Sequence, residues 1–307
     1  SNSKESVLDG INSICGIKPK WHNIDLSDSN ESINFLKNQE FDGIIHFAAF
    51  KAVGESVQKP LKYYRNNLIS LMNVLSYLKT HNNCAFIFSS SCTVYGQAEN
   101  LPITENASIQ NAESPYGNTK QICEEIINEC STAYGLKSIA LRYFNPIGAH
   151  PTGKIGELPL GLPQNLVPFI TQSAAGIRGS LNVYGNDYPT HDGTAIRDYI
   201  HVVDLAQAHI IALERLLNNK NLSEMEIFNL GTGKGSSVLE VIKAFEKASG
   251  EKLNYKIANR RKGDITSAYS DTKRAKEILK WESKKTLEDA LKDAWRWQKN
   301  LVQQGYA

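Results

Sequence analysis

Apolar runs and amphipathic stretches alternate along most of the chain, which is typical of a parallel sheet covered by helices on both faces. The apolar runs that predict strands occupy residues 21–26, 43–49, 84–90, 137–144 and 227–230. The stretches that predict helices occupy residues 30–37, 60–80, 115–134 and 204–217. Pro60 and Pro115 support two of these helices, because proline is tolerated in a first turn. We therefore expect an α/β fold with a doubly wound, Rossmann-like parallel sheet.

The amino-acid composition of the chain changes after Asn145-Pro146. Prolines and glycines become dense from there to Gly161, which indicates a crossing into a second unit. We expect residues 1–145 to form the Rossmann-like domain and residues 146–307 a smaller second domain. About residues 198–230 are expected to return to the first domain, because a helix and a strand are predicted there.

Composition excludes several classes of protein. The 307 residues carry 34 Lys and Arg against 32 Asp and Glu, with no basic stripe and interleaved aromatic residues that would indicate nucleic acid binding. No apolar run is long enough to span a membrane. The five cysteines show no C-x-x-C spacing and no zinc-type ligand cluster, so they indicate free thiols of a reducing compartment. We expect no nucleic acid, membrane or metal partner, and a cytoplasmic location.

The strongest chemical signal is a tyrosine one helical turn before a lysine. Tyr116-Gly-Asn-Thr-Lys120 opens the predicted helix 115–134, so both side chains share one helix face. The ammonium would favour the phenolate and lower the pKa of the tyrosine. Ser89-Ser90-Ser91 follows an apolar strand, at the edge where α/β sheets bind ligands. A base, a cation and a hydroxyl at one edge are typical of a site that removes hydride from a carbinol carbon.

The Tyr-x-x-x-Lys spacing alone is a weak signal, because the chain contains 13 tyrosines. Tyr269-Ser-Asp-Thr-Lys273 has the same spacing, but no strand ending in serines precedes it, and Asp271 has the character of a helix N-cap. We therefore interpret Tyr269 as structural or pocket-lining and Tyr116 as chemical. The alternative for Tyr116 is a helix tyrosine that packs on the sheet.

A glycine-rich cofactor turn is not apparent at the start of the chain. A dinucleotide-binding fold begins with a strand, a turn of the form G-x-G-x-x-G and a helix. Gly231-Thr-Gly233-Lys-Gly235 follows a predicted strand but lies far downstream, so we interpret it as a tight turn. We expect the first strand and the glycine loop to be absent from these 307 residues, which corresponds to about 30 residues or one βαβ unit.

Seven blocks of sequence stand out along the chain: HFAAFKAVGESV (46–57), FSSSCTVYG (88–96), SPYGNTK (114–120), RYFNPIGAH (142–150), GNDYPT (185–190), RDYIHVVD (197–204) and RRKGD (260–264). In this order they resemble blocks of the UDP-galactose 4-epimerases (UDP-glucose 4-epimerases) of the extended short-chain dehydrogenase/reductase family. The resemblance implies NAD as cofactor, a UDP-hexose as substrate and a homodimer. It also implies that the first domain binds NAD and the second the nucleotide sugar, with 4-epimerisation passing through a 4-keto intermediate.

The resemblance assigns roles to individual residues. It implies that Tyr116 is the base, that Lys120 tunes it and binds the ribose, and that Ser91 bonds the sugar hydroxyl. The implied cofactor contacts are Asp25 and Leu26 at the adenine, with Phe47, Ala48, Lys51, Asn66, Ser89, Tyr116, Lys120 and Phe144 along the cleft. The implied substrate contacts are Ser91, Asn145, Asn165, Leu166, Tyr184 at the uracil, Arg197 and Arg261 at the diphosphate, Asp264 at a ribose hydroxyl, and Ala268 beside the sugar.

Residue chemistry agrees with these roles but leaves alternatives open. Arginine presents a planar fork of donors that suits phosphate, and the turn at 163–165 is expected to precede a helix whose N-terminus favours an anion. From the residues alone, Arg197 has an equal claim to a surface ion pair with Asp198 or Asp192. Lys51 has an equal claim to be a solvated loop lysine.

Two other functions remain under consideration. A nucleotide-sugar 4,6-dehydratase would use an Asp-Glu pair after the strand serine or threonine, whereas Cys92 and Thr93 follow Ser91 here. A non-catalytic nucleotide-sugar-binding fragment is favoured by the absent glycine loop and opposed by the set of Ser91, Tyr116 and Lys120.

The sugar pocket is expected to be roomy. Some members of the resembled family carry a tyrosine four residues after the aspartate equated with Asp264, and Ala268 stands there in this chain. We expect UDP-GlcNAc and UDP-GalNAc to be interconverted as well. The alternative is that Tyr269 or a shifted backbone fills the gap.

Overall fold

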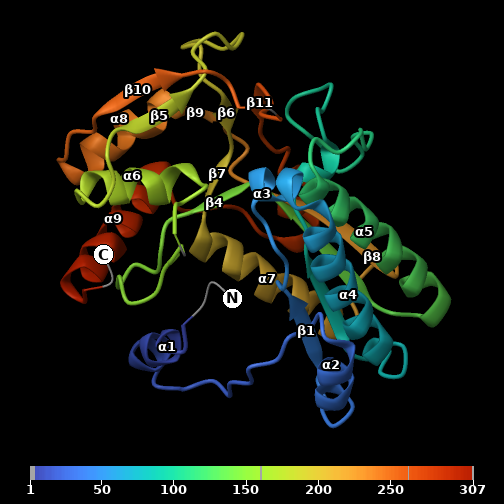
Figure 1. The fold of residues 1–307 in the computed structure, drawn as a ribbon. Helices are drawn as coiled ribbons and strands as arrows, with labels where there is room; N and C mark the ends of the chain where they lie inside the picture. Colours follow the sequence, from blue (N-terminus) through green and yellow to red (C-terminus); the bar gives the residue numbers. More distant parts are fainter. Residues whose placement is uncertain (1–3, 160, 262, 306–307) are drawn as a thin grey trace.

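A four-stranded parallel sheet forms the centre of the first half of the molecule. The computed structural model describes residues 4–159, 161–261 and 263–305, and its sheet has the strand order β1-β2-β3-β8 (Figure 1). The strands are β1 (Gly43–His46), β2 (Ala85–Ser89), β3 (Ser138–Tyr143) and β8 (Met225–Leu230). All three pairings are parallel, and each strand overlaps an apolar run that predicted it.

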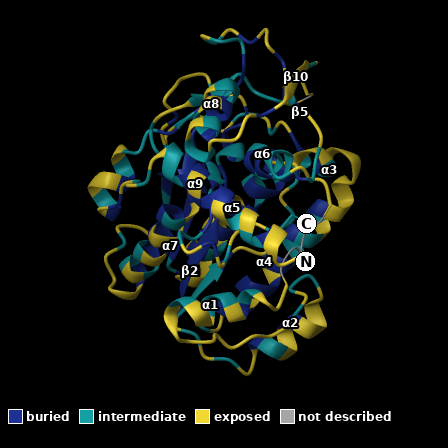
Figure 2. Ribbon diagram, turned by 90° about the vertical axis from the view of Figure 1, so that its left-hand side faces the viewer, coloured by how far each residue is buried: buried dark blue, intermediate teal, exposed yellow. Residues whose placement is uncertain are grey.

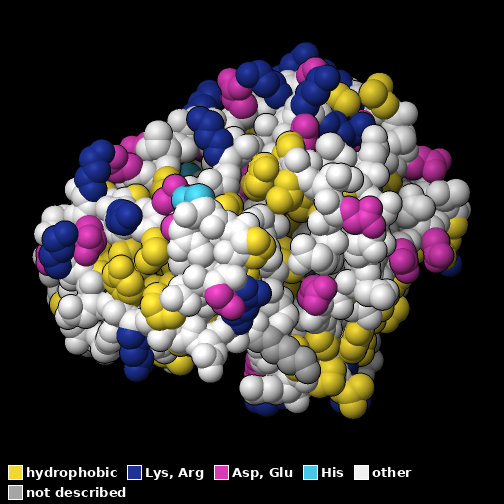
Figure 3. All heavy atoms as spheres, turned by 90° about the horizontal axis from the view of Figure 1, so that it is seen from above, with side chains coloured by type: hydrophobic (Ala, Val, Ile, Leu, Met, Phe, Trp, Pro, Cys, Tyr) yellow, Lys and Arg dark blue, Asp and Glu magenta, His cyan; other side chains and the backbone are white. Residues whose placement is uncertain are grey.

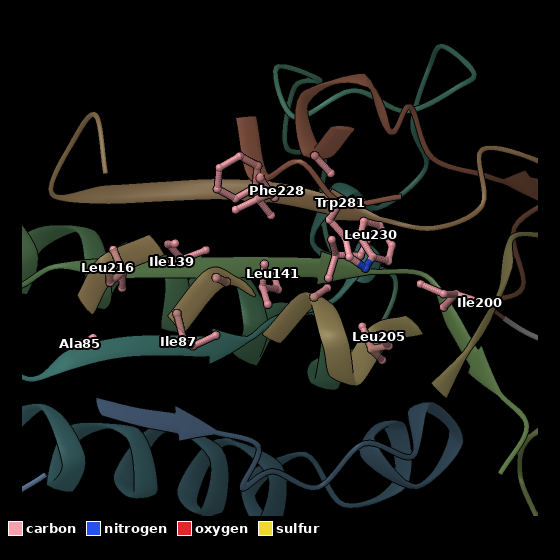
Figure 4. Close-up of a cluster of buried hydrophobic side chains, with 14 residues drawn as sticks. Ala85, Ile87, Ile139, Leu141, Ile200, Leu205, Leu216, Phe228, Leu230 and Trp281 are labelled. Carbon is pink, nitrogen blue, oxygen red and sulfur yellow. The ribbon is translucent and has the colours of Figure 1, made fainter. Parts of the chain in front are cut away.

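Helices cover both faces of this sheet. They are α2 (Ser29–Leu36), α4 (Pro60–Leu78) and α5 (Pro115–Tyr134) on one face and α7 (Val202–Leu217) on the other. Ile87 and Leu141 pack with Leu205 of α7 in one core (Figure 4). Phe86 and Phe88 pack with residues of α4 and α5 in another core. Because successive side chains of a strand point to opposite faces, this alternation confirms the predicted doubly wound sheet.

The outward faces of the surrounding helices are exposed, whereas buried positions gather along the sheet (Figure 2). Two short helices lie at the periphery, α1 (Val7–Cys15) and α3 (Val53–Gln58). Leu8 is the buried residue of α1. These peripheral helices therefore contribute little to the two cores on the sheet.

A third core lies beside the sheet and is built from helices and a small parallel pair of strands (Figure 1). Its elements are α6 (Leu166–Ala174), α8 (Val238–Ser249), α9 (Leu287–Gln303), β5 (Leu181–Tyr184) and β10 (Tyr255–Ala258). Capping boxes begin α8 at Ser237 and α9 at Thr286, which satisfies N–H groups at both helix starts. Phe245 and Trp295 meet edge to face in the centre, with ring centroids 5.8 Å apart.

The chain crosses several times between the four-stranded sheet and the core beside it. The short strands at the crossings are β4 (Asn145–Ile147), β6 (Ile196–Arg197), β7 (Tyr199–His201), β9 (Ser236–Ser237) and β11 (Ser267–Ala268). Strand β4 pairs with β7, and β6 lies between β11 and β9. After α7 and β8, the π-helical segment η2 (Ala275–Leu279) also packs on the sheet, together with Trp281. The predicted division into domains did not include a return of residues 275–281 to the sheet, where they pack in the core that also contains Leu205 of α7.

The predicted strand over 21–26 is wrong. These residues have no ladder partner among the residues that the structure describes. Their polar backbone groups meet side chains instead: Asn73 Nδ2 donates to the Leu26 carbonyl at 2.9 Å, and Ser32 Oγ donates to the Asp25 carbonyl at 3.2 Å. An apolar run predicts that a segment is extended and buried, but it becomes a strand only beside another strand.

Charges of both signs are interspersed on the face seen in Figure 3. Within residues 4–159, 161–261 and 263–305, no helix combines the length and apolar character needed to span a bilayer. The segment 231–235 forms the predicted turn between β8 and β9, with Gly233 at a φ of +74° that favours glycine.

Candidate active site

The three residues of the predicted chemical set lie at the carboxyl end of β2 and the start of α5. Ser91 follows β2 and caps a 3₁₀ turn, where its Oγ accepts the Thr93 N–H at 3.2 Å. Ser114 caps α5 by accepting the Gly117 N–H at 3.1 Å, and Pro115 occupies the first turn. Tyr116 and Lys120 follow on the buried face of α5.

Lys120 is held under the end of the sheet. Its Nζ donates to the Ser89 carbonyl at 2.7 Å and lies 4.6 Å from the centroid of the Phe88 ring. Burial lowers the pKa of Lys120 to about 8, against the opposing influence of Cys123 and Glu124. The lysine is thus a cation whose proton is weakly held near neutral pH.

The pKa of Tyr116 moves in the direction opposite to the one expected from its spacing to Lys120. Burial raises the pKa of the phenol, Tyr143 raises it further, and the Ser91 hydroxyl opposes this by favouring the phenolate. Desolvation dominates because Tyr116 is only 8% exposed, while the Lys120 ammonium is directed at the Ser89 carbonyl. An additional positive charge in the site is therefore required to produce a phenolate at neutral pH.

The implied cofactor residues lie along the carboxyl edge of β1 and β2. Because His46 pairs with Phe88, residues 47–48 and Ser89 leave the sheet side by side. Phe47 is 57% exposed there and its ring lies 4.6 Å from that of His209 on α7. The His209 Nε2 is buried, and no hydrogen-bond partner for it is found within the described ranges. An exposed aromatic ring beside a buried unpaired nitrogen fits a ligand laid across this edge.

The remaining cofactor candidates have contacts of their own. Asn66 Nδ2 donates to Asn67 Oδ1 at 3.0 Å on α4. Phe144 is buried beside Ala268. Asp25 accepts from Ser27, whose hydroxyl and amide lower the pKa of that carboxyl. Asp25 and Leu26 lie against α2 and α4, and no contact among the described residues links them to Tyr116.

On the substrate side, Asn145, Arg197 and Ala268 are brought together by the short strands at the crossing. Arg197 is opposite Ala268 in the β6–β11 register, and the Asn145 N–H donates to the Asp198 carbonyl at 2.9 Å. The alternative for Arg197, an ion pair with Asp198 or Asp192, is wrong. Arg197 Nη1 instead donates to the Ile196 carbonyl at 2.8 Å.

A second group of candidates lies around Tyr184, which is 38% exposed, and Tyr188, which is buried. Arg261 pairs with Asp264 at 3.0 Å, and its guanidinium lies 4.8 Å from the Tyr184 ring. Arg260 lies 4.0 Å from the ring of Tyr188. Burial and Asp264 raise the pKa of Tyr188, and Arg260, Arg197 and Arg261 oppose that shift, so all three arginines are near one phenol. Three converging guanidinium groups suit a diphosphate.

Lys51 and Asn165 meet through Glu157. Lys51 Nζ lies 3.1 Å from Glu157 Oε1, and Asn165 Nδ2 lies 3.5 Å from the same oxygen. Asn165 is the N-cap of α6 and Leu166 is its first residue, so the helix predicted after residues 163–165 is confirmed. Lys51 is therefore a partly exposed lysine with an ion pair rather than a simply solvated one. Exposed pairs of this kind contribute at most about 1 kcal/mol.

Tyr269 and Lys273 do not form a second site of the same kind. Tyr269 lies outside any helix and its carbonyl accepts the Ile103 N–H at 2.9 Å. Asp271 Oδ1 accepts the Lys273 N–H at 2.8 Å in the turn before η2, whose N-cap is Arg274, so the predicted N-cap role of Asp271 is wrong. This arrangement agrees with the structural interpretation of Tyr269.

Several buried polar residues near the site were missed in the sequence. Asp198 accepts five hydrogen bonds, from Thr232, Gly233 and Ser270. Arg142 is buried in β3 and pairs with Glu124 of α5. The available signal was a charged residue inside an apolar strand, since a buried charge must have a partner.

A doubly wound sheet with a serine after a strand, and a tyrosine and a lysine on the adjacent helix, is typical of a dinucleotide-dependent enzyme of the short-chain dehydrogenase/reductase class. The family model described as GDP-mannose 4,6 dehydratase matches residues 5–294. The UDP-glucose 4-epimerase of Bacillus subtilis is 47% identical over 303 residues, which cover 98% of this chain and 88% of the relative. The chain belongs to the UDP-glucose 4-epimerase family.

Solved structures agree with this assignment. The UDP-glucose 4-epimerase of Bifidobacterium longum, crystallised with NAD+ and UDP, matches with a TM-score of 0.92 and 42% identity, covering 97% of this chain and 88% of that one. The UDP-Glc/GlcNAc 4-epimerase of Campylobacter jejuni matches with a TM-score of 0.81 and 35% identity, covering 98% and 89%.

Proposed function

We propose that this chain interconverts UDP-glucose and UDP-galactose by epimerisation at C4 of the sugar, with NAD as cofactor. The observation that carries the proposal is the convergence of Ser91, Tyr116 and Lys120 at one end of the sheet. A cluster of arginines for a diphosphate accompanies them. The family of the chain and the ligands of its structural relatives support both parts.

The described residues fit the nicotinamide end of the cofactor, because Phe47, Ser89 and Lys120 share one edge. NAD supplies a hydride acceptor and donor, and its positive ring adds the charge that Tyr116 needs. Tyr116 Oη takes the proton of the sugar 4-hydroxyl and later returns it. Ser91 holds that hydroxyl. Lys120 keeps the ribose and the phenol in place from its anchor on the Ser89 carbonyl.

In this proposal the nucleotide half of the substrate is held more strongly than the sugar half. Arg197 and Arg261 hold the diphosphate and Tyr184 lies near the uracil, which gives strong charge-assisted contacts. Side chains without formal charge, among them Phe144 and Ala268, form the neighbouring cluster. The 4-keto sugar is therefore free to turn over while the nucleotide stays fixed, so that hydride returns to the opposite face.

The two alternatives are weaker. A dehydratase needs an acid near C6, and Cys92 and Thr93 supply no carboxyl after Ser91. A non-catalytic binding protein has no need for the buried Tyr116 and Lys120 pair. The deciding experiment measures NAD absorbance in the purified protein and UDP-glucose formation from UDP-galactose in a coupled assay. Bound NAD without epimerisation would contradict the proposal.

The pocket beside Ala268 is proposed to admit a 2-acetamido group. Ala268 is buried in one apolar cluster with Phe144 and Tyr95, while the ring of Tyr269 lies near Gly235, where an added Cβ would approach it to 3.2 Å. A methyl side chain at position 268 in place of a phenol is the feature that supports the proposal. The structural relative from Campylobacter jejuni is described as acting on both sugar types.

Ala268→Tyr is expected to reduce kcat/KM for UDP-GlcNAc by roughly tenfold or more, because pocket exchanges of this size change discrimination by about 1–3 kcal/mol. UDP-galactose turnover should change much less. Steady-state kinetics on both sugar pairs measure this, with Ala268→Ser as the matched small substitution. Absence of acetylated-sugar turnover in the native protein, or its persistence in Ala268→Tyr, would count against the roomy pocket.

We also propose a homodimer and a cytoplasmic location. Apolar residues are exposed on α3 and α4, with Val57, Leu61 and Met72 at 53%, 79% and 44%. A second copy would cover such a surface. The five cysteines are free, which suits a reducing compartment. Light scattering of the purified protein tests the dimer.

A further inference from the structure

A buried ion pair lies below the end of β2. Arg142 Nε donates to both carboxylate oxygens of Glu124, at 3.0 and 3.1 Å, and Nη2 donates to Oε2 at 2.5 Å. Both residues are less than a tenth exposed. Ser90 Oγ adds a fourth hydrogen bond by donating to Glu124 Oε1 at 2.5 Å. Since a buried ion pair contributes little net stability compared with apolar packing, its presence here calls for another explanation.

The pair touches the segments that carry the chemical groups. Glu124 follows Lys120 by four residues, so both are on one face of α5. Ser90 lies between Ser89, whose carbonyl accepts from Lys120, and Ser91. Arg142 precedes Tyr143, whose hydroxyl lies 2.7 Å from Ser89 Oγ. The ion pair thus joins the end of β2, the active face of α5 and the end of β3.

We infer that Glu124 and Arg142 are positioning residues for the reaction proposed above. They hold the serine segment 89–91 against α5, and their opposite charges cancel beside the Tyr116–Lys120 pair. Neither residue is assigned contact with substrate or cofactor. The inference rests on the proposed function only for its effect on turnover, since the local charge balance exists in the protein without ligands.

The groups that face Lys120 come from all the elements packed around it. They are Tyr116, Cys123 and Glu124 on α5, His46 on β1, and Phe88 and Ser89 on β2. Behind them, Arg142 of β3 bonds to Glu124, Tyr143 bonds to Ser89, and Cys92 is close to Tyr116. Burial, with a contribution from Lys120, lowers the pKa of His46 to about 3, so that ring is neutral. Burial raises the pKa of both thiols, so they are neutral as well. The charges next to the pair are therefore Glu124 and Arg142.

The sign of the effect follows from these charges. Removing the Glu124 charge leaves Arg142 uncompensated. The extra positive charge disfavours the Lys120 ammonium and favours the Tyr116 phenolate. Both groups then lose their protons at lower pH, so both limbs of the pH profile of kcat/KM should move to lower pH. A loss of packing alone would reduce activity at every pH without this displacement.

The test is Glu124→Gln, which keeps shape and removes charge. ¹⁵N NMR of the Lys120 ammonium, titrated from about pH 6 to 10, reads the charge balance without cofactor or substrate. The expected result is a fall of about one unit in the pKa of Lys120, as the loss of a negative charge one helical turn away gives at protein dielectric values. The alkaline limb of kcat/KM should move by a similar amount.

The chain offers a matched control in a second buried pair. Arg215 donates to Glu226 at 2.7 and 2.9 Å, with side chains 11% and 0% exposed, and none of these contacts reaches β2 or α5. Glu226→Gln should lower the melting temperature comparably and leave the Lys120 titration unchanged. An unchanged titration in Glu124→Gln, or an equal shift in Glu226→Gln, would overturn the inference.

The double variant Glu124→Gln/Arg142→Met removes both charges and keeps the test available if the single variant does not fold. Its Lys120 titration should return to within about 0.3 unit of the native one, which is small beside the shift given by one charge. A double variant that retains a full one-unit displacement would overturn the charge-balance role. If the NMR shifts appear but the native protein shows no epimerisation, the proposed function fails and the positioning role stands.

Discussion

Tyr116→Phe is expected to lower kcat for epimerisation by about 10²–10⁴-fold, the range that a positioned general base contributes. The substitution removes one oxygen, and the phenol is buried at the end of a helix beside Ser91. UDP affinity should be unchanged, because the arginine cluster around Tyr188 is not touched. Steady-state kinetics and calorimetric titration with UDP measure the two quantities separately.

Tyr269→Phe is the matched control for this experiment. Tyr269 has the same spacing to a lysine, but it lies in a loop and its backbone carbonyl, not its phenol, makes the contact with Ile103. It should retain native turnover. Native activity in Tyr116→Phe together with lost activity in Tyr269→Phe would show that the wrong tyrosine was assigned the chemistry.

The local motif predicted that Ser91, Tyr116 and Lys120 lie together, but not the direction of the Tyr116 pKa shift. Three consecutive serines after a strand and a Tyr-x-x-x-Lys helix start fixed the placement of Ser91, Tyr116 and Lys120, because both are consequences of backbone geometry. The direction of the Tyr116 pKa depends on how completely neighbouring elements bury it. Spacing along one helix contains no information about that burial.

Segments that depend on a distant partner were the ones predicted poorly. The run 21–26 has strand-like composition, yet its backbone groups meet Ser32 and Asn73 rather than another strand. The 275–281 segment packs on the sheet because Trp281 Nε1 donates to the Asp204 carbonyl at 3.1 Å, a contact across 77 positions. The four helices predicted by range, which became α2, α4, α5 and α7, were placed within a few residues, since periodicity and first-turn prolines act locally. Helices α1, α3 and α8 were not predicted.

The buried polar network around Asp198, between β6 and β7, could not be predicted from the sequence pattern. In sequence Asp198 was considered only as an ion-pair partner for Arg197. In the structure its carboxylate accepts from two loops that are 34 to 72 positions away. Only the assembled chain places five donors around one carboxylate.

Asp198→Asn is expected to destabilise the protein by about 2–5 kcal/mol, the range for leaving buried donors unpaired or breaking a buried charged network. Both carboxylate oxygens accept: Oδ1 takes two donors of Thr232, and Oδ2 takes Gly233 and two donors of Ser270. An amide NH₂ in either position meets donors. Thermal unfolding measures the loss.

The same substitution should weaken UDP binding while kcat falls less. The Asp198 backbone bonds to Ala268 and Asn145, and Arg197 is its direct neighbour, so loosening this residue shifts three proposed substrate contacts together.

Asp192→Asn is the matched control. Its carboxylate also accepts several bonds, from Thr194 and from Ser237, the N-cap residue of α8, but none from residues 231–233. A KM for UDP-galactose raised about tenfold in Asp198→Asn and near native in Asp192→Asn is expected, or roughly 1.4 kcal/mol of binding. Equal changes in both variants would mean that general destabilisation, not the placement of Arg197 and Asn145, sets the affinity.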